Sequence, residues 1–413
     1  MEATRGPGAV KNRPFPGRPG AFRIMAGNGC QRPSTLSGEG RCMRSTATGI
    51  ADRFLLRAVS YRFGEEGDAA ELRQLAGMMS DGDFHRLARN VSYHELAPLL
   101  HVIREDCSAQ CRPLPLPAPL AREWRDAHLR ETVRTAVIRY AAERALKALA
   151  EGGLRVVPLK GFFLDSLVYA RRGARSYRDL DLLVEGKALA DLHRILSRNG
   201  FRPRPGSPSF VPAPAHTVYF LLLEDGETMA EIDIHVGMHW PREYETRTRF
   251  SARDLWAHAF PTEVDGLPAW ALRTEHLVVT TILDVAVNHR YARLVKFRDL
   301  LEIARRFRVD WDEVSRWSRR WEVASFVGPA LLYLSEMAED PAPLRETADT
   351  VTPSYASMKL FLRWLRASSL PGHRSRSFSP SNLLFFTLAD SPTQRLRGLL
   401  HLPAHALRGL RRF

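Results

Sequence analysis

The spacing of apolar residues divides the chain into regions with different periods. Residues 50–152 carry apolar positions at helical spacing and end in a Gly-Gly pair, which is typical of a helix terminus. In residues 153–272 short runs of strand and helix period alternate, and in residues 273–370 helical spacing returns. The pattern predicts an α+β (α/β) protein, in which a small mixed β-sheet core lies between an N-terminal and a C-terminal helical module.

The middle region can be divided further into individual elements. Apolar runs of strand length alternate with amphipathic runs of helix length, and an Asp-Gly pair between two late β runs favours a hairpin. The predicted elements are a strand at 154–161 (LRVVPLKG), a helix at 162–172 (FFLDSLVYARR), a strand at 178–184 (RDLDLLV), a helix at 187–200 (KALADLHRILSRNG) and a hairpin within 216–240 (HTVYFLLLEDGETMAEIDIHVGMHW).

Two of these strands carry carboxylates where a buried strand would carry leucines. Side chains alternate between the faces of a strand, so Asp179 and Asp181 share one face and the intervening leucines the other. In the hairpin, Asp233 and His235 likewise share the face opposite two isoleucines. If the strands are neighbours, three carboxylates crowd together, which is unfavourable without a cation. A divalent metal site is one interpretation, and a solvated strand end or turn cap is the other.

The net charge of +14 is concentrated at the two ends of the chain. Residues 1–49 are rich in Gly, Pro and Arg and predict a disordered basic leader, and residues 371–413 form a basic tail. The region between them is almost neutral. This distribution argues mildly against binding of long nucleic acid by the folded part, although basic tails add salt-sensitive attraction to phosphate.

Few features point to a particular compartment. The four cysteines do not form a disulfide framework, and Cys107 and Cys111 lack a second pair of ligands at the spacing of a zinc finger. The sequence shows neither a secretory signal nor an apolar run of about 18 residues. We therefore expect a cytoplasmic protein without stable membrane association.

The ordered motifs resemble a known family. LKGFFLDSLVYARRGARSYRDLDLLV, followed by EIDIH, resembles the uncharacterised nucleotidyltransferase family of the DNA polymerase β-like superfamily. The shared features are a strand ending in LKG, an arginine four residues before Asp-x-Asp, the DLLV that follows, and a later Asp-x-His. The resemblance is strong from Leu154 to His235 and looser around the NHRYARLVKFRDLLEIA stretch.

The resemblance implies roles for particular residues. Asp179 and Asp181 would hold two Mg²⁺ ions, with Mn²⁺ as a substitute, and Asp233 would be the third carboxylate, which also orients the acceptor oxygen. Lys160 and Gly161 lie where related enzymes grip the triphosphate, and Arg175 is the family's arginine, which could clamp a phosphate. The alternatives are a surface lysine for Lys160 and a loop arginine for Arg175.

Further candidates carry less information. His235 fits a structural role beside the metal ligands better than direct contact with substrate. A later polar set falls on helical spacing, where polar pairs within the helix are the ordinary explanation and contact with nucleotide or acceptor is the alternative. This set comprises Asn288, His289, Arg293, Lys296 and Asp299, of which Arg293 and Asp299 are the candidate site residues.

The predicted reaction is transfer of a nucleoside monophosphate from an NTP, such as ATP, to an acceptor hydroxyl, with release of pyrophosphate. The acceptor stays open between a small molecule, a sugar, a protein side chain and an RNA 3′ end, and the oligomeric state also stays open. The competing interpretation is a catalytically silent nucleotide- or RNA-binding regulator, similar to an antitoxin, with the same fold. The complete set of three aspartates favours the enzyme.

Overall fold

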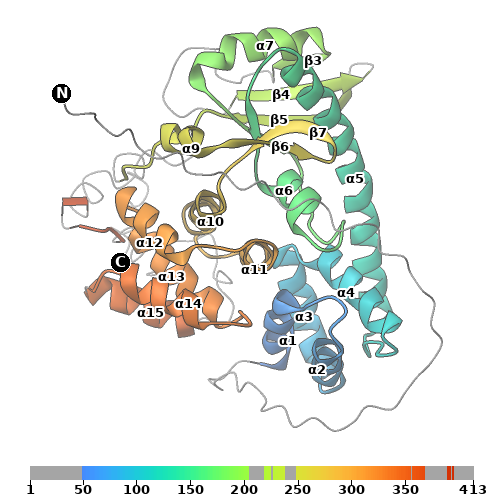
Figure 1. Ribbon diagram of the computed structural model, residues 1–413. Coiled ribbons are helices and arrows are strands. Elements are labelled where there is room, and N and C mark those ends of the chain that lie inside the picture. The colour runs from blue at the N-terminus through green and yellow to red at the C-terminus, as the bar shows by residue number, and fades with distance from the viewer. Residues whose placement is uncertain are drawn as a thin grey trace, which may run out of the picture. The chain divides into compact units, whose positions relative to one another are not determined.

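The N-terminal region of the structure, a computed structural model, is helical as the sequence predicts (Figure 1). Ser80 begins one helix with a capping box, because its hydroxyl accepts from the Asp83 amide while the Asp83 carboxylate accepts from the Ser80 amide. The longest helix ends at the predicted Gly-Gly pair, where Gly153 takes a φ of 72°. The helices are α1 (Ile50–Ser60), α2 (Glu66–Gly77), α3 (Asp81–His94), α4 (Ala97–Ala109) and α5 (Ala118–Glu151).

Only part of the chain is described. The predicted leader, apart from Gly49, and most of the predicted basic tail lie outside the described residues. The described residues belong to one compact unit, and the division into three modules stays a prediction. The structure describes residues 49–203, 218–224, 227–237, 248–354, 356–367, 388–391 and 393–394.

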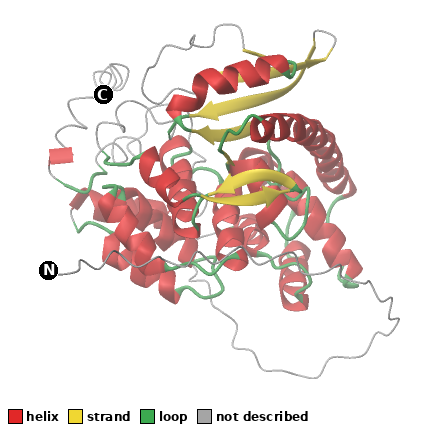
Figure 2. Ribbon diagram, turned by 45° about the horizontal axis from the view of Figure 1, so that its top comes forward, coloured by secondary structure: helices red, strands yellow, loops and turns green. Residues whose placement is uncertain are grey.

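A mixed five-stranded sheet forms the centre of the middle region (Figure 2). Its order is β1-β2-β5-β4-β3, with β2 parallel to β5 and the other neighbours antiparallel. The predicted hairpin is therefore present as β4 and β5, and the mixed sheet with flanking helices confirms the α+β fold. The strands are β1 (Val156–Pro158), β2 (Leu180–Val184), β3 (Phe201–Pro203), β4 (Val218–Glu224) and β5 (Glu227–His235).

Two helices close one side of this sheet. Helix α5 packs against β5 and also against α7 (Leu189–Arg198), which in turn contacts β3 (Figure 1). A Cβ on Gly152, at the end of α5, would lie 2.3 Å from the Ile195 Cδ1 of α7, so glycine at this position permits close approach as well as helix termination. The short 3₁₀-helix η2 (Gly186–Ala188) precedes α7.

Two predicted boundaries in the middle region are wrong. The predicted strand at 154–161 is only three residues long, because Lys160 already begins a helix and has a φ of 48°. The predicted helix at 162–172 ends at Val168, after the α-helix α6 (Lys160–Phe163) widens into the π-helix η1 (Leu164–Val168). The second difference could not be predicted from the sequence, because local residue preferences do not specify a π-helix.

A second hairpin, which the sequence analysis did not predict, lies beside β1. Strands β6 (Phe260–Val264) and β7 (Leu267–Ala271) pair antiparallel, and β7 contacts β1 and α5. Asp265 and Gly266 form the turn with φ values of 54° and 79°. Two positive φ values are what a type I′ turn requires, and Asp-Gly is a favoured pair for it. The signal was therefore present in the sequence.

The C-terminal region returns to helices, as predicted. Helix α11 is tied to the end of α1, because the buried Arg298 guanidinium donates to the backbone carbonyl oxygens of Val59 and Tyr61. No helix in the described residues is both long and apolar enough to cross a membrane. The helix α9 (Ala252–His258) still belongs to the middle region, before β6. The C-terminal helices are α10 (Thr274–Leu283), the π-helix η3 (Asp284–Asn288), α11 (Leu294–Arg306), α12 (Trp311–Arg320), α13 (Ala324–Ser335), α14 (Ala342–Val351) and α15 (Ala356–Ala367).

Candidate active site

The carboxylates predicted from the sequence come together across two neighbouring strands. Asp181 on β2 lies directly opposite Asp233 on β5 in the parallel register, and Asp179 immediately precedes β2. The condition set by the sequence, that the two strands be neighbours, is therefore met. The expectation that only the leucine face is buried is wrong, because every residue of β2 is buried, Asp181 included.

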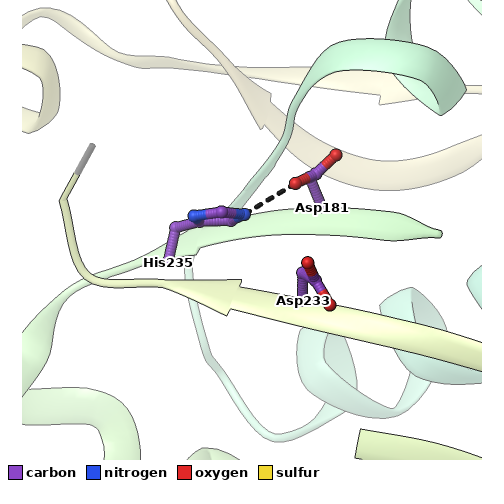
Figure 3. A group of neighbouring side chains, drawn as sticks. All are labelled: Asp181, Asp233 and His235. Carbon is purple, nitrogen blue, oxygen red and sulfur yellow. Dashed lines mark hydrogen bonds and ion pairs between the residues drawn. The ribbon is translucent and has the colours of Figure 1, made fainter. Parts of the chain in front are cut away.

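Figure 3 shows the closest group of these side chains. Asp181, Asp233 and His235 each offer one ligand atom, and these atoms lie within 4.8 Å of one another. Asp179 is not part of this group, although its charge acts on Asp233. His235, which was a lesser candidate from the sequence, thus belongs to this group, whereas Asp179 does not.

Asp233 is the least compensated carboxylate of the group. Burial, together with the negative charges of Asp181 and Asp179, raises its pKa to about 8. Its Oδ1 atom is buried and has no hydrogen-bond partner among the described residues. Such an unsatisfied buried oxygen is costly, and a bound cation would remove the cost.

Asp181 has the opposite character. Burial alone would raise its pKa, but Lys160 and His235 outweigh this effect and lower the pKa to about 2. Lys160 Nζ lies 2.7 Å from Asp181 Oδ1, and His235 Nε2 lies 2.6 Å from the same oxygen. Asp181 is therefore ionised and carries two donors on one oxygen.

The contact with Asp181 defines the role that the geometry favours for His235. An ionised carboxylate can only accept hydrogen bonds. The hydrogen is therefore on His235 Nε2, which donates a hydrogen bond to Asp181. A protonated ring nitrogen cannot bind a metal at the same time. This geometry favours orientation of Asp181 by His235 over direct metal ligation, in agreement with the expectation from the sequence.

The two residues predicted to grip a triphosphate differ in their surroundings. Lys160 is about 30% exposed at its side chain and faces the carboxylates. Gly161 is buried, and a Cβ there would lie 2.2 Å from the Cβ of Tyr177. The glycine is therefore required for packing against Tyr177, and its predicted contact with phosphate stays a prediction.

Arg175 lies in a closed ion pair away from the carboxylates. Its Nε and Nη2 atoms donate to the two carboxylate oxygens of Asp299 at 2.7 and 3.0 Å, and the Tyr169 hydroxyl donates to Asp299 at 2.7 Å. Arg175 and Asp299 are both almost completely buried. The pair joins the segment before β2 to α11, which favours a positioning role over the predicted phosphate clamp.

Arg293, the remaining candidate, lies at the N-terminal end of α11. Its guanidinium is 4.6 Å from the ring centroid of Tyr93, the geometry of a cation–π contact. The structure does not place it in the group of carboxylates. Contact between Arg293 and a substrate stays a prediction.

Asp284 was not predicted from the sequence as a site residue. Lys296 was predicted only as one of the polar residues at helical spacing. Asp284 is buried at the start of η3, and its Oδ2 accepts from Lys296 Nζ at 2.8 Å. Although burial opposes ionisation, Lys296 and Lys160 hold the pKa of Asp284 far below its usual range. The only local signal was the i, i+4 spacing of Asp284 and Asn288, whose side chains are hydrogen-bonded.

The donor set fits a divalent cation of the Mg²⁺ or Mn²⁺ type. Two opposed carboxylates provide oxygen ligands, which hard cations prefer. The unpartnered Asp233 Oδ1 and the raised pKa of Asp233 show that the site lacks positive charge on this side. A divalent ion would supply that charge.

Comparison with known proteins agrees with this geometry. The model of an uncharacterised nucleotidyltransferase family matches residues 80–339, which include all the carboxylates of the site and both lysines. A search of the curated proteins found no match. Because the family model covers more than half of the chain and the site lies within the match, the chain belongs to this uncharacterised nucleotidyltransferase family.

Proposed function

We propose that the protein transfers a nucleoside monophosphate from an NTP to an acceptor hydroxyl and releases pyrophosphate. The observation that carries the proposal is the pair formed by Asp181 and Asp233, in register on parallel strands, with one buried oxygen of Asp233 unpartnered among the described residues. Family membership supports nucleotidyl transfer in general terms. The complete carboxylate set supports an active enzyme rather than a silent regulator.

In this proposal the carboxylates have separate tasks. Asp179, Asp181 and Asp233 hold two Mg²⁺ ions, which when bound supply positive charge for the reacting phosphate and lower the pKa of the attacking hydroxyl. Asp233 also orients the acceptor oxygen, because it lies on the strand next to Asp181. His235 fixes the orientation of Asp181 through its hydrogen bond.

Lys160 attracts and holds the triphosphate in this proposal. Lys160 lies within reach of the carboxylates and carries the charge that a phosphate requires. We assign Arg175 a positioning role, because a clamp on phosphate would require the buried pair with Asp299 to open. The acceptor can be a small molecule, a sugar, a protein side chain or RNA, and the experiment below identifies it.

The test is incubation of the protein with each α-labelled NTP, Mg²⁺ and cell extract. We expect one or more labelled products, and we expect the label to disappear in the double variant Asp179→Asn/Asp181→Asn. Asp191→Asn is the matched control, because Asp191 lies on the exposed face of α7 and pairs with Arg194 in the same helix. Labelling that is absent with every nucleotide, or unchanged in the double variant, would contradict the proposal.

A further inference from the structure

Asp181 already has two donors on one of the oxygens that a cation could bind. The Lys160 ammonium lies 2.7 Å from Asp181 Oδ1, and the same oxygen accepts from His235. A divalent cation bound to either oxygen of Asp181 would lie within a few ångströms of this ammonium. Because like charges at this range repel strongly in a partly buried site, the ammonium and the cation compete for Asp181.

A small cavity lies next to Lys160. It has a volume of about 30 Å³, and Lys160, Asp284 and Lys296 line it together with leucine side chains such as Leu159 and Leu183. A cavity needs roughly 10–15 Å³ of such space to hold a water molecule, and an ammonium group is of similar size. The cavity therefore has room for the end of the Lys160 side chain.

Two aspartates line this cavity, Asp284 and the Asp299 that is already paired with Arg175. Asp284 is buried, it holds Lys296 at 2.8 Å, and its other oxygen accepts from Asn288 at 3.0 Å. Burial lowers the pKa of Lys160, but Asp181 and Asp284 outweigh this effect and raise it. Lys160 thus has carboxylates on two sides, Asp181 and Asp179 beside the metal-ligand group and Asp284 across the cavity.

We propose that Lys160 is a movable counterion, which neutralises Asp181 in the metal-free protein and turns into the cavity toward Asp284 when, in the absence of nucleotide, a divalent cation binds Asp181 and Asp233. Asp284 is then a positioning residue that acts through Lys160. The inference rests on the proposed function only in requiring that a divalent cation bind this carboxylate group. It assigns Asp284 a part in cation binding that requires no direct contact with the ion.

The test measures Mn²⁺ affinity without nucleotide, from the electron paramagnetic resonance signal of free Mn²⁺. The variants are Lys160→Met, Asp284→Asn and the double variant. Lys160→Met keeps the aliphatic stem and the same demand on the backbone at φ 48° while removing the charge. Arg178→Met is the control, because Arg178 precedes Asp179 but is mostly exposed and does not contact Asp181.

We expect Lys160→Met to bind Mn²⁺ about tenfold more tightly than the unmodified protein, because the competing ammonium is gone. Asp284→Asn should bind it several-fold more weakly, since Lys160 then has no alternative partner. In the Lys160→Met background the Asp284→Asn substitution should have almost no effect, which is the non-additivity expected of coupled residues. Arg178→Met should change the affinity less than about twofold.

Failure of this inference can be told apart from failure of the proposed function. Mn²⁺ binding that is lost in Asp233→Asn but unchanged or weaker in Lys160→Met would overturn the movable counterion and leave the metal site intact. An equal effect of Asp284→Asn in both backgrounds would also overturn it. No Mn²⁺ binding in any variant would overturn both proposals. If Asp284→Asn does not fold, by circular dichroism, the Lys160→Met result decides alone.

Discussion

Two of the buried groups of charges among the described residues are built in opposite ways. In the Arg175–Asp299 pair both carboxylate oxygens are bonded to the guanidinium, and the Tyr169 hydroxyl adds a further donor. In the Asp181–Asp233 group two carboxylates face each other, and one oxygen of Asp233 has no partner among the described residues. Removing one partner of a fully bonded buried ion pair destabilises a fold. A group of carboxylates with too little positive charge around it costs stability and is retained where a ligand binds.

The largest expected effect is on transfer activity. Asp233→Asn should lower the rate of labelled-product formation on the order of a thousandfold, because charge stabilisation worth several kcal/mol is lost. The same variant should be at least as stable to heat as the unmodified protein, since it removes an unfavourable buried carboxylate. Product formation and melting temperature measured together check this. A variant that melts well below the unmodified protein would place Asp233 among the structural charges.

The fully bonded pair should respond in the reverse way. Arg175→Ala leaves Asp299 buried without its partner, so the free energy of unfolding should fall by about 3–5 kcal/mol in a urea titration. Arg130→Ala, on the exposed side of α5, is the control and should change stability by less than about 0.5 kcal/mol. If Arg175→Ala folds with normal stability but no longer binds nucleotide, the phosphate clamp is correct and the positioning role is wrong.

These two groups also differ in how far the sequence predicts them. The faces of Asp181 and Asp233 follow from the period of two residues in a strand, and their proximity follows once the strands pair. The partner of Arg175 lies 124 residues away on α11, and no local pattern connects them. Asp284 is similar, because a buried aspartate at the start of a π-helix looks in sequence like an ordinary polar position.

A smaller effect is expected where the carboxylate group is supported by a neighbour. His235→Asn removes the donor from Asp181, and Mg²⁺ affinity should fall by about 10- to 100-fold, which is typical when a partner of a metal ligand is lost. His85→Asn, on α3, is the matched control and should leave the affinity unchanged. A complete loss of binding in His235→Asn would indicate that the imidazole is itself a ligand.

The smallest expected effect is on the pH dependence of stability without metal. The pKa of Asp233 is raised from 3.8 to about 8, so the folded state holds a proton that the unfolded state has lost. The contribution of Asp233 to stability is therefore complete below about pH 4 and falls as the pH rises from 4 to 8. Melting curves over this range should show a decline that Asp233→Asn reduces and Mg²⁺ counteracts. An identical pH profile in both proteins would contradict the raised pKa.

The most direct test of the account is a calorimetric titration with Mg²⁺ at pH 7 in two buffers of different ionisation enthalpy. Because the pKa of Asp233 is about 8, this carboxyl is mostly protonated at pH 7, and a cation must displace its proton. We predict that the unmodified protein binds Mg²⁺ with release of about one proton, and that Asp233→Asn loses both the binding and the proton release. Absence of Mg²⁺ binding to the unmodified protein would contradict the claim that Asp181 and Asp233 form a divalent metal site. The claim would also be contradicted if Asp233→Asn bound Mg²⁺ as tightly as the unmodified protein, without proton release.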